Sequence, residues 1–243
     1  GVWPVKDIDT SFVFTTDAGG GDPDKTSPTL RRYHKRLWSK ALPDGRMFAL
    51  DDQTPDSYLR HSSELGEFWL SSDAVMATYR GYQSMSFIKE LVSVEEQDAF
   101  DSITYTIGAM MVFPAERVNG KQTINGARGF HPRIADRMDL TLECIRRHYT
   151  SLTDPSLMRT NPMGEVLNRY PAFFGLFDDF DGYVNYFLLQ DLVDESGSVR
   201  FFMQFDDFTT SAKPRNLQEY LEFRRRSVEF VQARNRRIDE LDC

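Results

Sequence analysis

The stretch "TINGARGFHPRIADRMDLTLECIRRHY", residues 123–149, decides most of the fold and raises the main question about function. It holds five arginines, two aspartates and one glutamate, although the whole chain has a formal net charge of -8. Apolar residues recur along it at spacings of three and four, which predicts a helix over about 132–149 with one face in a core. The residues of this apolar stripe are Ile134, Met138, Leu142, Ile145 and Tyr149.

Charged side chains fall opposite this stripe when the chain is wound at 3.6 residues per turn. Glu143 and Arg147 are four residues apart, in the order that favours an ion pair on a helix. The simplest interpretation is therefore a solvated face that carries paired charges. Its residues would be Asp136, Asp139, Glu143, Arg146 and Arg147.

The residues that lead into this helix suggest a binding site. In "TINGARG", 123–129, two glycines permit tight turns, and a loop before a helix start has free backbone N–H groups that bind anions. An arginine adds a guanidinium that holds a phosphate or carboxylate with two hydrogen bonds. We expect a pocket for a nucleotide or another phosphate- or carboxylate-bearing small molecule, with enzymatic turnover left open. The candidate residues are Thr123, Asn125, Arg128, Arg133, Asp136, Arg137, Asp139 and Glu143.

Two alternatives to this pocket follow from the same charges. In a purely structural interpretation, Arg128 is held by Asp136 or Asp139 and only fixes the loop. In the other, the protein is an interaction module whose charged helical faces, including 224–226 and 234–238, recognise a protein partner. A ligand site requires the candidate residues to converge in a concavity, whereas an interface requires an exposed apolar patch with a charged rim.

Composition narrows the class of protein. The chain has 243 residues, of which 40% are apolar and 27% charged, the balance of a soluble globule. Its 29 basic and 37 acidic residues argue against nucleic acid as a partner. No apolar run approaches the ~18 residues of a membrane span, so we expect no membrane contact. Two cysteines, Cys144 and Cys243, fit a reducing compartment, and we expect a cytoplasmic protein.

Two groups of reactive side chains have structural explanations that we favour. Cys144 shares a flank of the helix with Arg137 and His148, which would favour a thiolate, but a cysteine in mid-helix is usually a packing residue. The aspartates of 178–181 could hold Mg²⁺, yet aspartates before a helix usually cap it. Since no Cys/His cluster has zinc-ligand spacing either, we expect neither a metal site nor a cofactor.

Helices and strands elsewhere do not alternate regularly, which favours an α+β fold over a doubly wound sheet. The Gly- and Asp-rich segment 15–28 predicts a loop, and Ser27 followed by Pro28 predicts a helix start. We expect a single α+β domain over 1–243, with a small mixed or antiparallel sheet packed by several helices and a long C-terminal helix. Besides 132–149, predicted helices cover about 28–40, 162–193 and 216–241, and Pro171 should break or kink the second of these regions. Predicted strands cover 46–50, 66–72, 105–114 and 198–205, with a hairpin turn at Asn119-Gly120.

Several segments spread over most of the chain carry a family resemblance, namely "LRRYHKRLWSKALPDG" (30–45), "SELGEFWLSSD" (63–73), 123–149, "YFLLQDLVD" (186–194) and "FVQARNRRI" (230–238). In these segments the chain resembles a family of uncharacterised bacterial proteins with no assigned activity. The resemblance implies one intact unit in a bacterial, cytoplasmic setting. It implies no catalytic residue.

Overall fold

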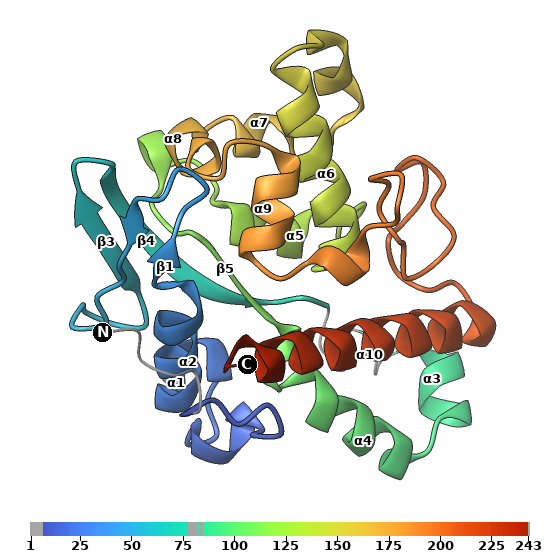
Figure 1. Ribbon diagram of the computed structural model, residues 1–243. Coiled ribbons are helices and arrows are strands. Elements are labelled where there is room, and N and C mark those ends of the chain that lie inside the picture. Colours follow the sequence, from blue (N-terminus) through green and yellow to red (C-terminus); the bar gives the residue numbers. More distant parts are fainter. Residues whose placement is uncertain (1–6, 77–81, 83–84, 243) are drawn as a thin grey trace.

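Two small antiparallel sheets form the β part of the fold in the computed structural model, which describes residues 7–76, Tyr82 and 85–242. The larger sheet has the strand order β3-β4-β5, and the smaller pairs β1 with β2 (Figure 1). All five residues of β5 are buried, whereas exposed and buried residues mix along β3 and β4. The strands are β1 Lys40–Ala41, β2 Met47–Phe48, β3 Leu59–Ser63, β4 Gly66–Ala74 and β5 Met110–Pro114.

Helices supply most of the remaining structure, which confirms the α+β class and the long C-terminal helix. None of the helices in the described ranges combines the length and apolar character needed to cross a membrane. The α-helices are α1 Pro23–Thr26, α2 Pro28–Trp38, α3 Ser86–Leu91, α4 Val94–Thr104, α5 Ile124–Phe130, α6 Met138–Ser151, α7 Gly164–Leu167, α8 Pro171–Gly175, α9 Phe180–Tyr186 and α10 Leu217–Asp239. The 3-10 turns are η2 Phe14–Asp17, η4 Ile107–Ala109, η5 Val118–Gly120, η6 Pro155–Thr160, η7 Gln190–Leu192 and η8 Glu240–Asp242.

The predicted starts of the first and last long helices are confirmed by their caps. The Ser27 hydroxyl accepts a hydrogen bond from the Leu30 N–H, and Pro28 occupies the first turn of α2. At α10 the Asn216 side chain accepts from the Glu219 N–H. Each cap satisfies a backbone N–H that has no partner within its helix.

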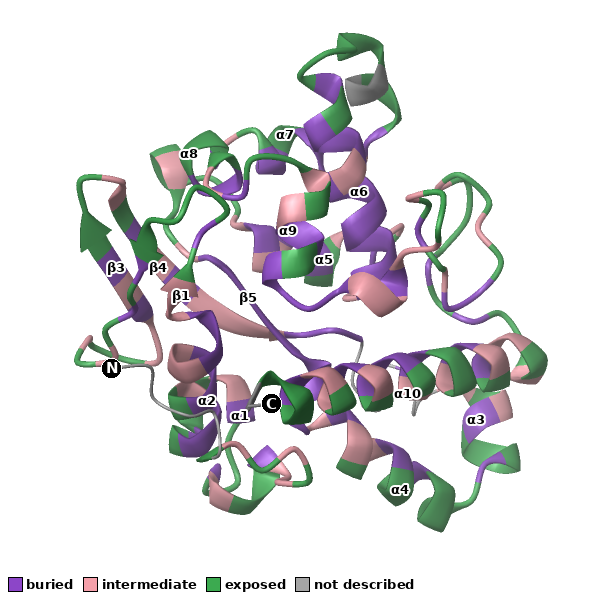
Figure 2. Cartoon of the chain, in the orientation of Figure 1, coloured by how far each residue is buried: buried purple, intermediate pink, exposed green. Residues whose placement is uncertain are grey.

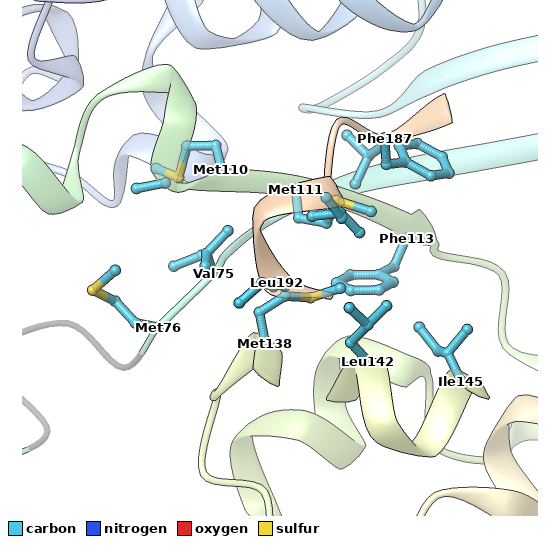
Figure 3. Close-up of a cluster of buried hydrophobic side chains, with 14 of the residues drawn as sticks. Val75, Met76, Met110, Met111, Phe113, Met138, Leu142, Ile145, Phe187 and Leu192 are labelled. Atoms are coloured by element: carbon cyan, nitrogen blue, oxygen red, sulfur yellow. The ribbon is translucent and has the colours of Figure 1, made fainter. Parts of the chain in front are cut away.

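The core lies between β5 and α6. Met138, Leu142 and Ile145 of α6 face Met111 and Phe113 of β5 (Figure 3). All of the predicted apolar stripe is buried, since Tyr149, its most exposed member, is only 9% exposed. Buried residues therefore line the inner faces of α6 and β5, as the purple ribbon in Figure 2 shows.

The long helix α10 is fixed to the fold by a close backbone contact with η4. The Gly108 N–H donates to Asn235 Oδ1 at 2.7 Å. A Cβ atom at Gly108 would lie 2.5 Å from the Val231 carbonyl oxygen, a distance that real Cβ atoms do not show. Only glycine therefore allows α10 to approach this closely.

Several local predictions are wrong, in that one helix starts later than expected and two predicted loops contain helical turns. The helix predicted from 132 begins only at Met138, since Ala135 and Asp136 have positive φ values of 45° and 59°. The predicted "TINGARG" loop is instead helix α5, which Thr123 caps by accepting a hydrogen bond from the Gly126 N–H. The predicted loop at 15–28 contains η2 and α1.

Other predicted elements are shorter than expected or absent. Asn119-Gly120 belongs to η5, not to a hairpin between strands. In place of a strand over 198–205 there is a single bridge between Val193 and Val199. The helical region expected over 162–193 is divided into α7, α8, α9 and η7. The predicted break at Pro171 is confirmed, since α8 begins there, and further breaks lie at Asp178 and Leu188, whose φ values are positive.

Candidate functional site

The structure does not bring the predicted site residues into one concavity. Thr123 and Asn125 line a pocket of about 310 Å³. Arg133 and Arg137 line a separate concavity of about 540 Å³ against segment 203–222. The other four candidates, Arg128, Asp136, Asp139 and Glu143, line neither concavity.

Arg128 is fully buried and ion-paired, so its guanidinium is committed within the protein. Its Nη1 lies 2.5 Å from Asp73 Oδ2, its Nε donates to Thr141 Oγ1 at 2.9 Å, and its Nη2 donates to the Asp136 carbonyl at 2.9 Å. Its Cζ also lies 5.1 Å from the centre of the Phe113 ring. The structural interpretation was right that Arg128 is held within the protein and that Asp136 takes part, through its backbone carbonyl. Asp139 does not take part in these contacts, and the carboxylate partner is Asp73 of β4.

Most of the charged face of α6 is covered by protein and only Asp136 and Arg146 are half-exposed, so the prediction of a solvated face is wrong. Asp139 is 0% exposed and Glu143 is 4% exposed. Arg137 Nε and Nη2 donate to the Asp139 carboxylate, which also accepts from the Phe202 N–H at 2.8 Å. Arg147 pairs with Glu143 and, at 2.6 Å, with Asp207. The segment around 202–212 therefore lies over this face and takes up its charges.

Asp179 and Cys144 have the structural roles that the sequence suggested. The Asp179 carboxylate accepts from the Gly182 N–H at 2.8 Å and caps α9. Cys144 is fully buried, and burial raises the pKa of its thiol. Within the part of the chain that the structure describes, no group of three or more His, Cys, Asp or Glu residues could hold a metal ion.

The pocket beside Thr123 and Asn125 is the strongest candidate site, because its walls carry carboxylates, hydroxyls, an amide and two cations. It is formed by the start of α1, the end of β4, the start of α5 and two short loops. Its lining residues are Asp22, Asp24, Lys25, Ser57, Tyr58, Ser71, Ser72, Asp73, Ala115, Arg117, Thr123 and Asn125.

A chain of hydrogen bonds runs from the protein core to Asp24 in this pocket. Trp38 Nε1 donates to His34 Nδ1 at 3.0 Å, and His34 Nε2 lies 2.9 Å from Ser72 Oγ. The Ser72 hydroxyl donates to Asp24 Oδ1 at 2.6 Å. Since an indole N–H can only donate, Nδ1 of His34 accepts, and the neutral ring carries its proton on Nε2. Burial, with a smaller contribution from Arg234, lowers the pKa of His34 to about 3, so the ring is neutral and every donor points toward Asp24.

Asp24 and Asp73 form a pair of carboxyls with raised pKa values. Burial and the neighbouring charge of Asp73 raise the pKa of Asp24 to about 7. Burial raises the pKa of Asp73 to about 6, although Arg128 opposes the shift. A carboxyl that titrates near neutral pH is suited both to accept and to donate a proton, so Asp24 is the best candidate for acid–base chemistry in this pocket.

The amide of Asn125 offers the pocket an unused acceptor. Its Nδ2 donates to Ser71 Oγ at 2.9 Å and to the Ser72 carbonyl at 3.3 Å. Because a carbonyl only accepts, these contacts fix the orientation of the amide. Oδ1 is then buried without a hydrogen-bond partner among the described residues. A ligand with a hydroxyl or amino group could satisfy this atom.

Lys25 and Arg117 add positive charge at the mouth of the pocket. Both residues are exposed, and within the described ranges neither makes an ion pair. They can therefore meet an anionic group of a ligand without first breaking an internal salt bridge.

Sequence reasoning missed Asp24, Asp73 and His34 as parts of a site. One signal was present, since Asp22-Pro23 is a cap followed by a first-turn proline and indicates a helix start inside the predicted loop. Asp73 directly follows the predicted strand 66–72. No local sequence pattern indicates that the carboxyls of Asp24 and Asp73 lie close together in the fold.

The fold and the site define an α+β protein with a small polar pocket that contains two protonatable carboxyls. The chain belongs to the family of unknown function DUF6994, whose family model matches residues 8–238. This match confirms the resemblance to an uncharacterised family. No curated protein and no solved structure matches the chain.

Proposed function

We propose that the protein binds a small polar molecule in the pocket of Asp24, Asp73 and Asn125, and that Asp24 exchanges a proton with it. The observation that carries the proposal is the pKa of about 7 at Asp24, a carboxyl on the wall of a pocket of about 310 Å³. A volume of this size suits a small ligand, at the lower end of the range that ligand pockets cover.

The lining favours a ligand with hydroxyl or amino donors and one anionic group. Asp24 and Asn125 Oδ1 present acceptors, which require donors on the ligand. Lys25 and Arg117 present cations for a phosphate or carboxylate. We therefore propose the anion contact on these two cations and not on Arg128, whose guanidinium is bound to Asp73.

The proton transfer is assigned to Asp24. In its ionised form Asp24 accepts a proton from a hydroxyl or amino group of the ligand, and in its protonated form it returns the proton. The Ser72 hydroxyl, itself oriented by His34, holds Asp24 Oδ1 in place. Asp73 is kept beside Asp24 by Arg128, and its charge helps to keep the pKa of Asp24 high. We further propose a bacterial, cytoplasmic setting, supported by the free, buried Cys144 thiol and by the family resemblance.

The first prediction concerns ligand binding. In a thermal-shift screen of sugar phosphates, hydroxy acids, amino acids and nucleoside monophosphates, we expect at least one compound to raise the melting temperature of the wild type by mass action. The shift should disappear in Asp24→Asn and persist in Asp44→Asn, which changes an exposed carboxylate outside the pocket. A compound that stabilises wild type and a folded Asp24→Asn variant equally, or a screen without any shift, would contradict the proposal.

The second prediction concerns pH. Because the folded-state pKa of Asp24 is about 7 and its ordinary value is 3.8, the buried carboxyl favours folding only while it is protonated. The stabilisation of the folded state by protonated Asp24 is complete below about pH 4 and is lost as the pH rises through 7. Asp24→Asn should therefore be more stable than wild type at pH 8, on the order of 2 kcal/mol after solvent screening, and not at pH 4. Denaturant melts at both pH values measure the free energy of unfolding of each protein. A difference between variant and wild type that is the same at pH 4 and at pH 8 would refute the raised pKa.

A further inference from the structure

A second concavity, of about 820 Å³, lies between α10 and segment 190–202 and is rich in arginine. It is separate from the pocket of Asp24, because the two share no lining residue. Its arginines are Arg200, Arg225, Arg226, Arg236 and Arg237. Its carboxylates are Asp191, Asp194 and Glu229. We call this concavity the arginine groove.

Three of these arginines already have carboxylate partners. Arg237 Nε lies 2.6 Å from Asp191 Oδ2, and Arg225 Nη1 lies 3.4 Å from Glu229 Oε1. Arg226 pairs at 2.8 Å with Glu222, which lies outside the groove. The groove therefore holds more cations than carboxylates, in a chain whose net charge is -8.

The other two arginines carry the excess charge. Arg200 and Arg236 are both exposed, and neither forms a salt bridge with another described residue. The only hydrogen bond from the Arg200 guanidinium within these ranges is a long one, 3.5 Å from Nε to the Val193 carbonyl. Asp194, the groove carboxylate six residues before Arg200, instead accepts hydrogen bonds from the Ser196 hydroxyl and from the N–H groups of Ser196 and Ser198.

The shape of the groove suits an extended chain. Arg225 and Arg236 are eleven residues apart on one face of α10, which is roughly 16 Å along the helix axis. About five residues of an extended peptide cover that length. Between the arginines the groove contains the half-buried apolar side chains of Val193, Phe201 and Ala233. An apolar floor with a charged rim is the usual anatomy of a protein interface.

We propose that the arginine groove binds an extended acidic segment of a partner protein, with its carboxylates on Arg200 and Arg236 and its apolar side chains on the floor. A nucleic-acid strand fits less well, because Asp191, Asp194 and Glu229 would repel a backbone that is charged at every nucleotide. A peptide can place its acidic residues opposite the arginines and its neutral residues opposite these carboxylates.

The test uses a fluorescein-labelled peptide of three Glu-Glu-Leu repeats, the same peptide with glutamine in place of glutamate, and labelled deoxythymidine decamer. Anisotropy titrations should show binding of the glutamate peptide that weakens as NaCl is raised. The double variant Arg200→Gln/Arg236→Gln should bind it about tenfold more weakly, since two partly exposed ion pairs are lost. The matched control is Arg32→Gln/Arg159→Gln, which removes two exposed arginines outside the groove and should change the affinity less than twofold.

Three outcomes would overturn the proposal. The first is no binding of the glutamate peptide at millimolar concentration and low salt. The second is equal binding of the glutamine peptide, which would remove charge as the basis of recognition. The third is tighter binding of the decamer through Arg200 and Arg236, which would make the groove a nucleic-acid site.

Discussion

Replacement of Arg128 by methionine is expected to lower the free energy of unfolding by about 3–5 kcal/mol at pH 8, as for other buried charges that lose their partner. The variant leaves the Asp73 carboxylate without its counterion in the core. It also leaves Thr141 Oγ1 and the Asp136 carbonyl without the donors that Arg128 supplies. Urea denaturation at constant pH measures the loss.

The pH dependence separates this charge effect from loss of packing. Without Arg128 the pKa of Asp73, already raised to about 6, should rise further, because the guanidinium lowers it in the wild type. At pH 5 Asp73 is then protonated in the variant, and the destabilisation should shrink. Arg128→Met/Asp73→Asn should recover part of the stability at pH 8, while the exposed control Arg46→Met should change it by less than ~0.5 kcal/mol. A loss that is the same at pH 5 and pH 8 would show that packing, not charge, sets the effect.

Arg234→Met should be the second strongly destabilising change, at about 3 kcal/mol, because three buried carbonyl groups lose a charged donor. Arg234 is 0% exposed and donates to the carbonyl oxygens of Gly108, Met110 and Phe187, at 3.2, 2.6 and 2.8 Å. Burial lowers its pKa to about 9. Removing the buried charge offsets part of the lost hydrogen bonding, which keeps the expected effect below that of Arg128.

The pKa of Lys40 provides a second measurement, because it depends on the charge of Arg234. Burial and, to a smaller extent, Arg234 lower the pKa of Lys40 to about 8. In Arg234→Met the pKa of Lys40 should rise, which NMR titration of its side chain can follow. Arg234→Lys keeps a positive charge and should leave Lys40 closer to its wild-type value. An unchanged Lys40 titration in Arg234→Met would contradict the assigned interaction.

Much of the fold could be predicted because the relevant patterns are local. The apolar spacing of α6 identified the core face, and Ser27 with Pro28 marked the start of α2 through a cap that needs only neighbouring residues. The turn at Ala135 and Asp136 could not be predicted in this way. Aspartate tolerates a left-handed backbone but alanine disfavours it, and the turn is held by the surrounding fold, including the hydrogen bond from the Met138 N–H to the Val75 carbonyl.

The candidate site was less predictable because it is built from contacts between distant residues. The sequence identified Thr123 and Asn125, which do line the pocket, but the prediction that places ligand contacts on Arg128 remains untested. Asp24 and Ser72 are hydrogen-bonded across 48 positions of the chain. The Phe202 N–H reaches Asp139 across 63 positions and turns an apparently solvated face into a buried one. Contacts between such distant residues cannot be predicted from the periodicity of one segment.

The close contact between Gly108 and α10 has a consequence for the order of events during synthesis on the ribosome. The carbonyls of Gly108 and Met110 are satisfied by Arg234, which is made more than 120 residues later. Until that part of α10 has left the exit tunnel, the carbonyls around β5 lack the charged donor that they have in the finished fold. Long-range closure of this kind is slow and leaves apolar surface exposed in the nascent chain. Helix α10, which is translated after β5, thus supplies the charged donor that completes the packing around this strand.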